Sequence, residues 1–202
     1  FFPEQGGQGC DTGSLGDAHV IDVQIKDGIV FHTTDAPFTV GDTVNGVINW
    51  DNRFDRMQNH TGEHIVSGIL HSKFGYDNVG FHLGDAVMTL DTSGELTAEQ
   101  IPDVEMAANR AVYENVAVLV SYPDASALTN MDYRAKLELT EDVRIVTIPG
   151  WDVCACCAPH VAFTGQIGMI KILDAIHYKV KEDHQYITKA AYVVLGIRMD
   201  GH

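Results

Sequence analysis

Apolar and polar residues alternate through much of the first fifty positions, as they do in strands that bury one face. Residues 20–25 and 29–32 flank Asp27-Gly28, a dipeptide typical of a two-residue hairpin turn, and residues 43–50 alternate in the same way. The glycine-rich stretch at residues 3–9 lacks this alternation and is predicted to be a loop. Several short strands with tight turns predict a small β-barrel over residues 1–50.

The pattern changes to a helical period after residue 50. Ile65, Ile69 and Leu70 recur on one helix face, while Asp51 or Asn52 can cap the start and Gly75 can end the helix. This predicts one long helix at the boundary between two domains, residues 1–50 and 51–202.

Helices and strands are mixed beyond residue 75. Residues 80–83 and 86–90 bracket a second hairpin turn at Gly84-Asp85, and a helix is predicted from Thr97 to about residue 115, with Pro102 in its early part. Strands are expected at residues 116–122, 143–148 and 168–173, and the run at 186–197 favours a last strand, with a helix as the alternative. The expected fold class is α+β, a small N-terminal β-barrel followed by an α+β domain.

Composition limits the class of protein. The chain has 202 residues, of which 45% are hydrophobic and 20% charged, so a soluble globular protein is expected, and no run of about 18 apolar residues predicts a membrane span. No signal peptide is recognisable, and because the chain opens at Phe1 without Met we expect an upstream piece to have been removed or left out. Three of the four cysteines fall within residues 154–157, which suits a metal and a reducing compartment better than disulfides. The predicted location is the cytoplasm.

The net charge of −15 argues at first against a nucleic-acid ligand. The charges are unevenly distributed, however. Residues 1–50 carry seven acids and one base, and residues 76–130 carry nine acids and one base, whereas residues 51–75 and 131–202 hold eleven of the thirteen basic residues. An acidic body with a neutral-to-basic face is compatible with RNA, and an acidic proteome would give the same composition.

Two pairs of possible metal donors stand out. His60 and His64 are four residues apart on the predicted helix and therefore lie on one face, and Cys156 and His160 repeat the spacing in a cysteine-rich turn. Three imidazoles and one thiolate suit a tetrahedral zinc (Zn2+) site. The alternative is that the histidines are partly buried and satisfied by their neighbours, which leaves the second pair unexplained. A zinc protease is excluded, because Thr61 stands where its general-base Glu would follow the first His.

The linked motifs resemble those of the freestanding alanyl-tRNA editing proteins, relatives of the editing domain of alanyl-tRNA synthetase. The resemblance rests on the glycine-rich segment 1–13, on residues 56–64, on Tyr133-Arg134 with Lys136, and on residues 154–168. It implies that residues 51–202 form a zinc-binding aminoacyl-tRNA editing domain and that the zinc ligands are His60, His64, Cys156 and His160. Cys154 and Cys157 are then non-ligands or substitute ligands, because only Cys156 has the spacing to His160. Two departures from the family pattern are the segment Cys157-Ala-Pro159 between the second pair of ligands, and Gln5 and Cys10 where glycines are frequent.

The resemblance further implies an aminoacyl-tRNA deacylase that removes serine, and possibly glycine, in trans from mischarged tRNA(Ala). A synthetase pocket made for alanine cannot strongly reject either amino acid, so hydrolysis at a second site is the usual remedy. Zinc would activate water or position the aminoacyl group, and four protein ligands leave no obvious open position. Catalytic residues are not assigned, although Glu63 and His82 are polar groups that could assist.

Two other functions fit the sequence. One is the related threonyl-type editing reaction, or removal of another amino acid from another tRNA. The other is a zinc-stabilised RNA- or protein-binding module without turnover. The glycine-rich loop has two interpretations, a tight turn at the entrance of the barrel or a contact with RNA or with the amino acid of the substrate.

Overall fold

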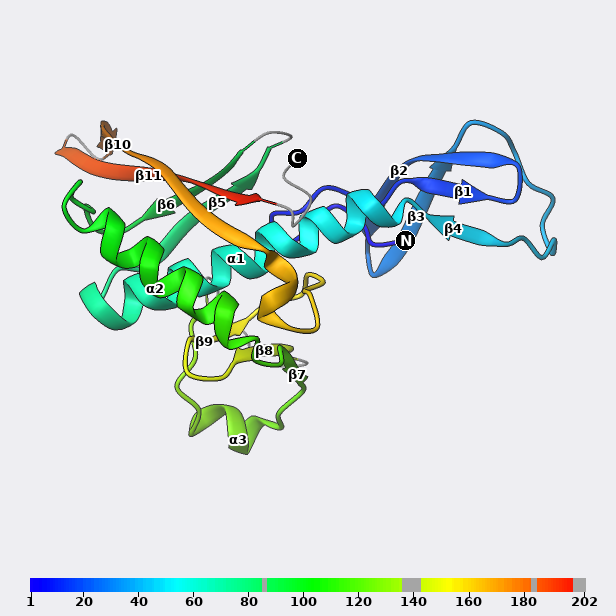
Figure 1. Cartoon of the computed structure of the whole chain (residues 1–202). Coiled ribbons are helices and arrows are strands. Elements are labelled where there is room, and N and C mark those ends of the chain that lie inside the picture. Colours follow the sequence, from blue (N-terminus) through cyan, green and yellow to red (C-terminus); the bar gives the residue numbers. More distant parts are fainter. Residues whose placement is uncertain (85–86, 136–142, 183–184, 198–202) are drawn as a thin grey trace.

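The computed structural model describes residues 1–84, 87–135, 143–182 and 185–197, and beyond residue 173 it describes the backbone alone. A long helix, α1 (Trp50–Phe74), runs through the middle of the molecule, with sheets arranged around it (Figure 1). Asn49 caps its start by accepting a hydrogen bond from the amide of Asn52, and Gly75 ends it in a left-handed conformation, φ 70°. The predicted helix is therefore confirmed, although its cap lies two or three residues earlier than expected.

The first fifty residues form a four-stranded antiparallel sheet beside the start of α1 (Figure 1). Its strands are β1 (Gly13–Leu15), β2 (Ala18–Lys26), β3 (Ile29–Thr34) and β4 (Gly46–Ile48), in the order β3-β2-β1-β4. Asp27 and Gly28 both have positive φ, 52° and 75°, so the hairpin predicted at this dipeptide is confirmed.

The predicted barrel is not formed within this segment, all of which is described. The outer strands β3 and β4 do not pair with each other, so the sheet stays open. Closure needs a continuous ladder around tilted strands, whereas β1 and β4 have only three residues each. The strand expected at residues 43–50 is short because Trp50 already belongs to α1. The division into domains at residue 50 stays a prediction.

A second antiparallel sheet packs against α1 and contains β5 (Asn78–Leu83), β6 (Met88–Thr92), β10 (Met169–Glu182) and β11 (Gln185–Ile197) in the order β10-β11-β6-β5. The predicted hairpin between β5 and β6 is confirmed by their pairing, while Asp85 in its turn lies outside the described residues. The C-terminal run is a strand, not a helix, because it pairs with β10 along its whole length.

Helix α2 (Ile101–Glu114) packs beside α1 and contains Pro102 in its first turn, as predicted, but it begins four residues after Thr97. A third sheet joins β7 (Leu119–Ser121), β8 (Ile145–Ile148) and β9 (Asp152–Ala155). The sequence did not predict β9 or the short helix α3 (Ala125–Thr129), and β7 is much shorter than the apolar run at residues 116–122 suggested. No helix in the described part of the chain has the length and apolar content needed to cross a bilayer.

The central stretch of α1, residues 60–70, is buried on all sides. Its apolar side chains share one core with β5, β6, α2 and β10. On its other flank the helix backbone closely approaches the turn between β8 and β9, since a Cβ on Gly68 would overlap the carbonyl oxygen of Trp151. This approach places the segment that follows β9 against the middle of α1.

Candidate metal centre

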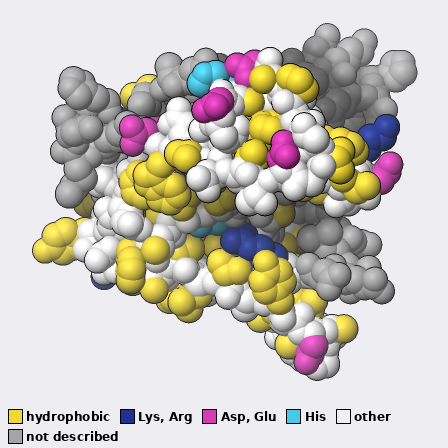
Figure 2. Space-filling view, turned by 90° about the vertical axis from the view of Figure 1, so that its right-hand side faces the viewer, with side chains coloured by type: hydrophobic (Ala, Val, Ile, Leu, Met, Phe, Trp, Pro, Cys, Tyr) yellow, Lys and Arg dark blue, Asp and Glu magenta, His cyan; other side chains and the backbone are white. Residues whose placement is uncertain are grey.

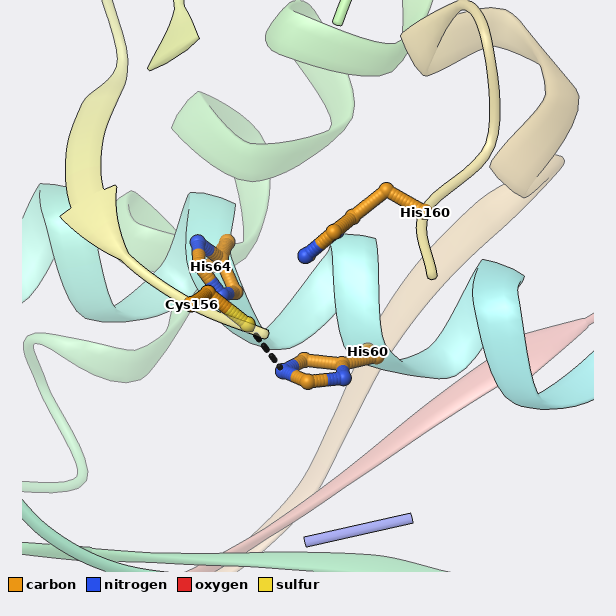
Figure 3. A group of neighbouring side chains, drawn as sticks. All are labelled: His60, His64, Cys156 and His160. Carbon is orange, nitrogen blue, oxygen red and sulfur yellow. Dashed lines mark hydrogen bonds between the residues drawn. The ribbon is translucent and has the colours of Figure 1, made fainter. Parts of the chain in front are cut away.

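The four predicted ligands come together although Cys156 lies 92 positions after His64 in the sequence. His60 and His64 project from one face of α1, and Cys156 and His160 come from the segment after β9 (Figure 3). One ligand atom from each residue lies within 4.8 Å of those of the other three. The ring centroids of His60, His64 and His160 are 4.5–5.1 Å apart.

The spacing of these atoms suits a small cation. In a tetrahedral zinc site with Zn–N and Zn–S bonds of about 2.0–2.3 Å, neighbouring donor atoms lie about 3.3–3.8 Å apart. The Cys156 Sγ and His60 Nε2 atoms are already 3.6 Å apart. The other donors therefore need only small inward movements to complete such a shell.

Each histidine uses Nδ1 for a contact with the protein. His64 Nδ1 lies 2.9 Å from the Asp152 carboxylate, and His160 Nδ1 lies 3.1 Å from the Thr61 hydroxyl. His60 Nδ1 contacts the side-chain amide of Gln8, and the His60 ring also stacks on Phe81. Contacts of this kind orient the rings of metal-binding histidines and leave Nε2 for the metal.

One buried atom points to a missing partner at the centre of this cluster. His160 Nε2 has no hydrogen-bond partner among the described residues. A buried imidazole nitrogen without a partner is costly, and a cation would satisfy it. The donor set of three nitrogens and one sulfur also matches the preferences of zinc, so the residues present fit this metal.

Burial and charge act differently on two of the rings. Burial lowers the pKa of His64, but the hydrogen bonds to Asp152 and Cys156 outweigh it and bring the pKa well above its usual 6.5. Burial holds the pKa of His160 well below 6.5, and the nearby His64, His60 and Arg144 add to the effect. His160 is therefore kept neutral, the form in which imidazole binds a metal.

Asp152, which contacts His64 Nδ1, belongs to none of the motifs recognised in the sequence. Burial alone would raise the pKa of its carboxyl group, but the hydrogen bonds from His64 and Arg134 bring it below its usual 3.8. Arg134 donates to both carboxylate oxygens, at 2.8 and 2.9 Å, and is part of the Tyr133-Arg134 motif. The only available signal for Asp152 was its position two residues before the cysteine cluster.

The glycine-rich loop reaches the same centre. Gln8 is 1% exposed, and its amide nitrogen contacts His60 and donates to the carbonyl of Pro159 at 3.1 Å. Its amide oxygen accepts from Arg53, which also pairs with Asp11 at 2.6 Å. Gln8 thus links the N-terminal segment to both halves of the metal centre. The loop is a tight turn, as one interpretation predicted, although no barrel is formed beside it, and its contact with RNA or with the amino acid of the substrate stays a prediction.

The remaining candidate residues occupy different environments. Glu63 is buried, and one oxygen accepts from Ser67 and Asn78 at 2.5 Å each while the other lies 3.9 Å from His60 Nε2. His82 is exposed on β5, next to the buried Phe81 and therefore on the opposite face of the strand, away from the four ligands.

The other two cysteines of the cluster also differ from Cys156. The Cys154 Sγ lies within 4.8 Å of donor atoms of His64 and Asp152, but burial raises the pKa of its thiol. The Asp152 carboxylate of this second group is already paired with Arg134. Cys157 is exposed. These observations favour Cys156 as the only cysteine ligand.

The sequence of the chain is also similar to known proteins. Residues 143–186, which include Cys156 and His160, match the family described as the threonyl and alanyl tRNA synthetase second additional domain. The chain is 34% identical over 183 residues to an alanine–tRNA ligase of Methanococcus maripaludis. It is 33% identical over 179 residues to the alanyl-tRNA editing protein Aarsd1 of Mus musculus, and each of these matches covers 86% of the chain. The chain is related to alanyl-tRNA editing proteins.

The resemblance inferred from the motifs is therefore confirmed over most of the chain. The alanyl-tRNA editing protein Aarsd1-B of Xenopus laevis is similar to the same extent, 35% identical over 182 residues. The chain spans only 20% of the length of the alanine–tRNA ligase and 43% of each of the two editing proteins.

Proposed function

We propose that this protein is a zinc-dependent aminoacyl-tRNA deacylase that hydrolyses the ester of mischarged tRNA(Ala), with serine and possibly glycine as the amino acids removed. Water attacks the carbonyl carbon of the ester, the bond to the ribose oxygen breaks, and the free amino acid and the tRNA hydroxyl are the products. The convergence of donor atoms from four residues within 4.8 Å, together with the buried His160 Nε2 atom that lacks a hydrogen-bond partner among the described residues, carries this proposal.

The residues around the centre have separate tasks in this reaction. His60, His64, Cys156 and His160 hold the metal, which when bound supplies the positive charge that polarises a carbonyl group or promotes ionisation of water. Asp152 and Gln8 fix the orientation of two of the imidazoles. Glu63 provides a buried carboxylate oxygen 3.9 Å from the donor nitrogen of His60, from where it can accept a proton from attacking water.

The proposal is tested with three substrates and two matched variants. Seryl-tRNA(Ala), glycyl-tRNA(Ala) and correctly charged alanyl-tRNA(Ala) are incubated with zinc-loaded wild type, with Cys156→Ala and with Cys157→Ala. We expect the wild type and Cys157→Ala to hydrolyse seryl-tRNA(Ala), and Cys156→Ala to lose that activity with little effect on alanyl-tRNA(Ala). Equal activity in Cys156→Ala contradicts the role of the metal site, and no hydrolysis by zinc-loaded wild type favours a binding module without turnover.

A different tRNA is included in the same assay. The family that matches residues 143–186 is named for threonyl as well as alanyl synthetases. Seryl-tRNA(Thr) therefore serves as a fourth substrate. Faster hydrolysis of seryl-tRNA(Thr) than of seryl-tRNA(Ala) would reassign the tRNA while leaving the chemistry of the site unchanged.

A further inference from the structure

A groove of about 250 Å³ lies next to the metal centre, between the start of α1 and the third sheet. Figure 2, which looks at this side of the molecule, shows His and Lys or Arg side chains recessed between ridges that carry hydrophobic side chains. Its lining includes three side chains of α1, two from the segment around β7, and residues on either side of the cysteine turn, among them Trp50, Phe54, Met57, Val120, Arg144 and His160.

One wall of the groove is a planar aromatic surface. Trp50 is 59% exposed, an unusual position for the largest apolar side chain, and its ring stacks on Phe54 with centroids 6.1 Å apart and planes at 28°. Phe54, one helical turn further along α1, supports one face of the indole through this contact. A supported, solvent-exposed indole is the kind of platform on which a nucleic-acid base stacks.

The groove also carries a fixed positive charge in a very acidic chain. Among the described residues its lining includes Arg144 and no carboxylate, although the chain as a whole has a net charge of −15. Arg144 Nη1 donates to the carbonyls of Cys156 and Ala158 at 2.7 and 3.0 Å, so the guanidinium is anchored to the loop that carries the metal ligands. A cation fixed in this position attracts a negatively charged phosphate group of a nucleic acid.

The groove and the metal centre share one residue. His160 belongs both to its lining and to the cluster of donor atoms. Trp50, Phe54 and Met57 follow one another at helical spacing on the face of α1 that continues to Thr61 and His64. The distance along the helix axis from Trp50 to His60 is roughly 15 Å at 1.5 Å per residue. The stripe of side chains that lines the groove therefore leads along α1 toward the ligands.

We propose that this groove binds the terminal adenosine nucleotide of the tRNA ester, with the adenine stacked on Trp50, a phosphate paired with Arg144, and the ester directed to the metal centre past His160. The volume lies just below the roughly 300–1,000 Å³ of sites for drug-sized ligands, so it accommodates one nucleotide and not a length of strand. The assignment rests on the proposed deacylase function, because that function supplies the nucleotide.

Binding of the trinucleotide CCA, which carries no amino acid, tests the groove independently of turnover. The trinucleotide is titrated into the zinc-loaded protein while the two tryptophan indole N–H signals are followed by NMR, with Trp151→Phe to assign them. We expect the Trp50 signal to shift, and Trp50→Ala to weaken binding by about 10-fold while Trp50→Tyr retains most of it. Val120→Glu, which places a carboxylate in the groove beside Arg144, is expected to weaken binding to a similar extent.

Tyr113→Ala is the matched control, since Tyr113 is an aromatic residue that is 90% exposed on α2 and does not line the groove. Its affinity for CCA should equal that of the wild type. In the deacylation assay, Trp50→Ala should raise KM for seryl-tRNA(Ala) more than it lowers kcat.

The outcomes separate this inference from the proposed function. Failure of the wild type to bind CCA, or equal affinity in wild type and Trp50→Ala, overturns the assignment of the groove, even if the protein hydrolyses its ester. Trp50-dependent binding of CCA by a protein that hydrolyses none of the esters supports the nucleotide site and refutes the deacylase.

Discussion

Replacing Asp152 with asparagine tests how the metal centre is supported. The side chain of Asp152 is 1% exposed, and its two oxygens accept hydrogen bonds from Arg134 and from His64 at 2.8–2.9 Å. Asparagine has nearly the same shape but lacks the charge, and its amide group turns a donor toward one of these donors. The variant therefore removes the electrostatic support while keeping the packing.

The size of the effect follows from burial. Removing one partner of a buried ion pair costs about 3–5 kcal/mol, and because Arg134 is 14% exposed and can be partly hydrated we expect about 3 kcal/mol in the free energy of unfolding. Loss of a group that orients a metal-binding histidine typically weakens metal affinity by about 10–100-fold. We expect Asp152→Asn to fall within this range.

Two measurements check the prediction: urea unfolding of the metal-free protein, and zinc affinity by competition with a chelating dye. Asp77→Asn is a matched control, because Asp77 also contacts a histidine, His71, at 3.0 Å, but both side chains are about half exposed or more, at 48% and 65%. This variant should lose less than about 1 kcal/mol and keep its zinc affinity. The reasoning is refuted if Asp152→Asn binds zinc as tightly as the wild type, or if both variants lose equal stability.

Three further predictions follow from the geometry. Gln8→Leu removes the amide that joins the glycine-rich loop to the metal centre, so zinc affinity should fall by about 10-fold in the chelator competition, and unchanged affinity would contradict the link. Gly68→Ala should lower the urea midpoint by the equivalent of about 2–4 kcal/mol because its Cβ overlaps backbone, whereas Gly62→Ala, on the same helix with 3.7 Å to the nearest side chain, should be neutral or stabilising; similar midpoints would refute the close approach. Without metal, the stability difference between wild type and Asp152→Asn should be largest between pH 3.8 and 6.5, where both members of the pair with His64 are charged. It should shrink as the pH falls through the lowered pKa of the carboxyl group or rises through the raised pKa of the imidazole, so a constant difference from pH 3 to 9 would contradict the pairing.

Local patterns were sufficient to predict some elements of the fold. The helix that carries His60 and His64 has apolar residues at helical spacing and a glycine at its end, and the hairpin at Asp27-Gly28 needs only the preference of this dipeptide for positive φ. Each of these signals is contained in a short stretch of the sequence. The ligand spacing within each pair is equally local.

The remaining features of the fold and the site depend on contacts between residues that are far apart in the sequence. Strand β9 exists because Asp152–Ala155 pairs with β8 and not because of its own composition, and the predicted barrel depended on whether two distant strands meet. Gln8 lies 52 positions before His60, and a loop without periodicity gives no sign of where it packs. Asp152 can be buried because Arg134 and His64 hydrogen-bond to it, and the residues next to it in the sequence show neither contact.

Metal binding by matched cysteine variants tests the central claim most directly. Metal content is determined for wild type, Cys156→Ala and Cys157→Ala, and the cobalt-substituted proteins are examined for the charge-transfer absorption of a thiolate bound to the metal. We expect one metal ion per chain in the wild type and in Cys157→Ala, both with the thiolate band, and loss of the band with much weaker binding in Cys156→Ala. A wild type that binds no metal, or a Cys156→Ala variant that keeps both the ion and the band, would contradict the convergence of His60, His64, Cys156 and His160 on one cation.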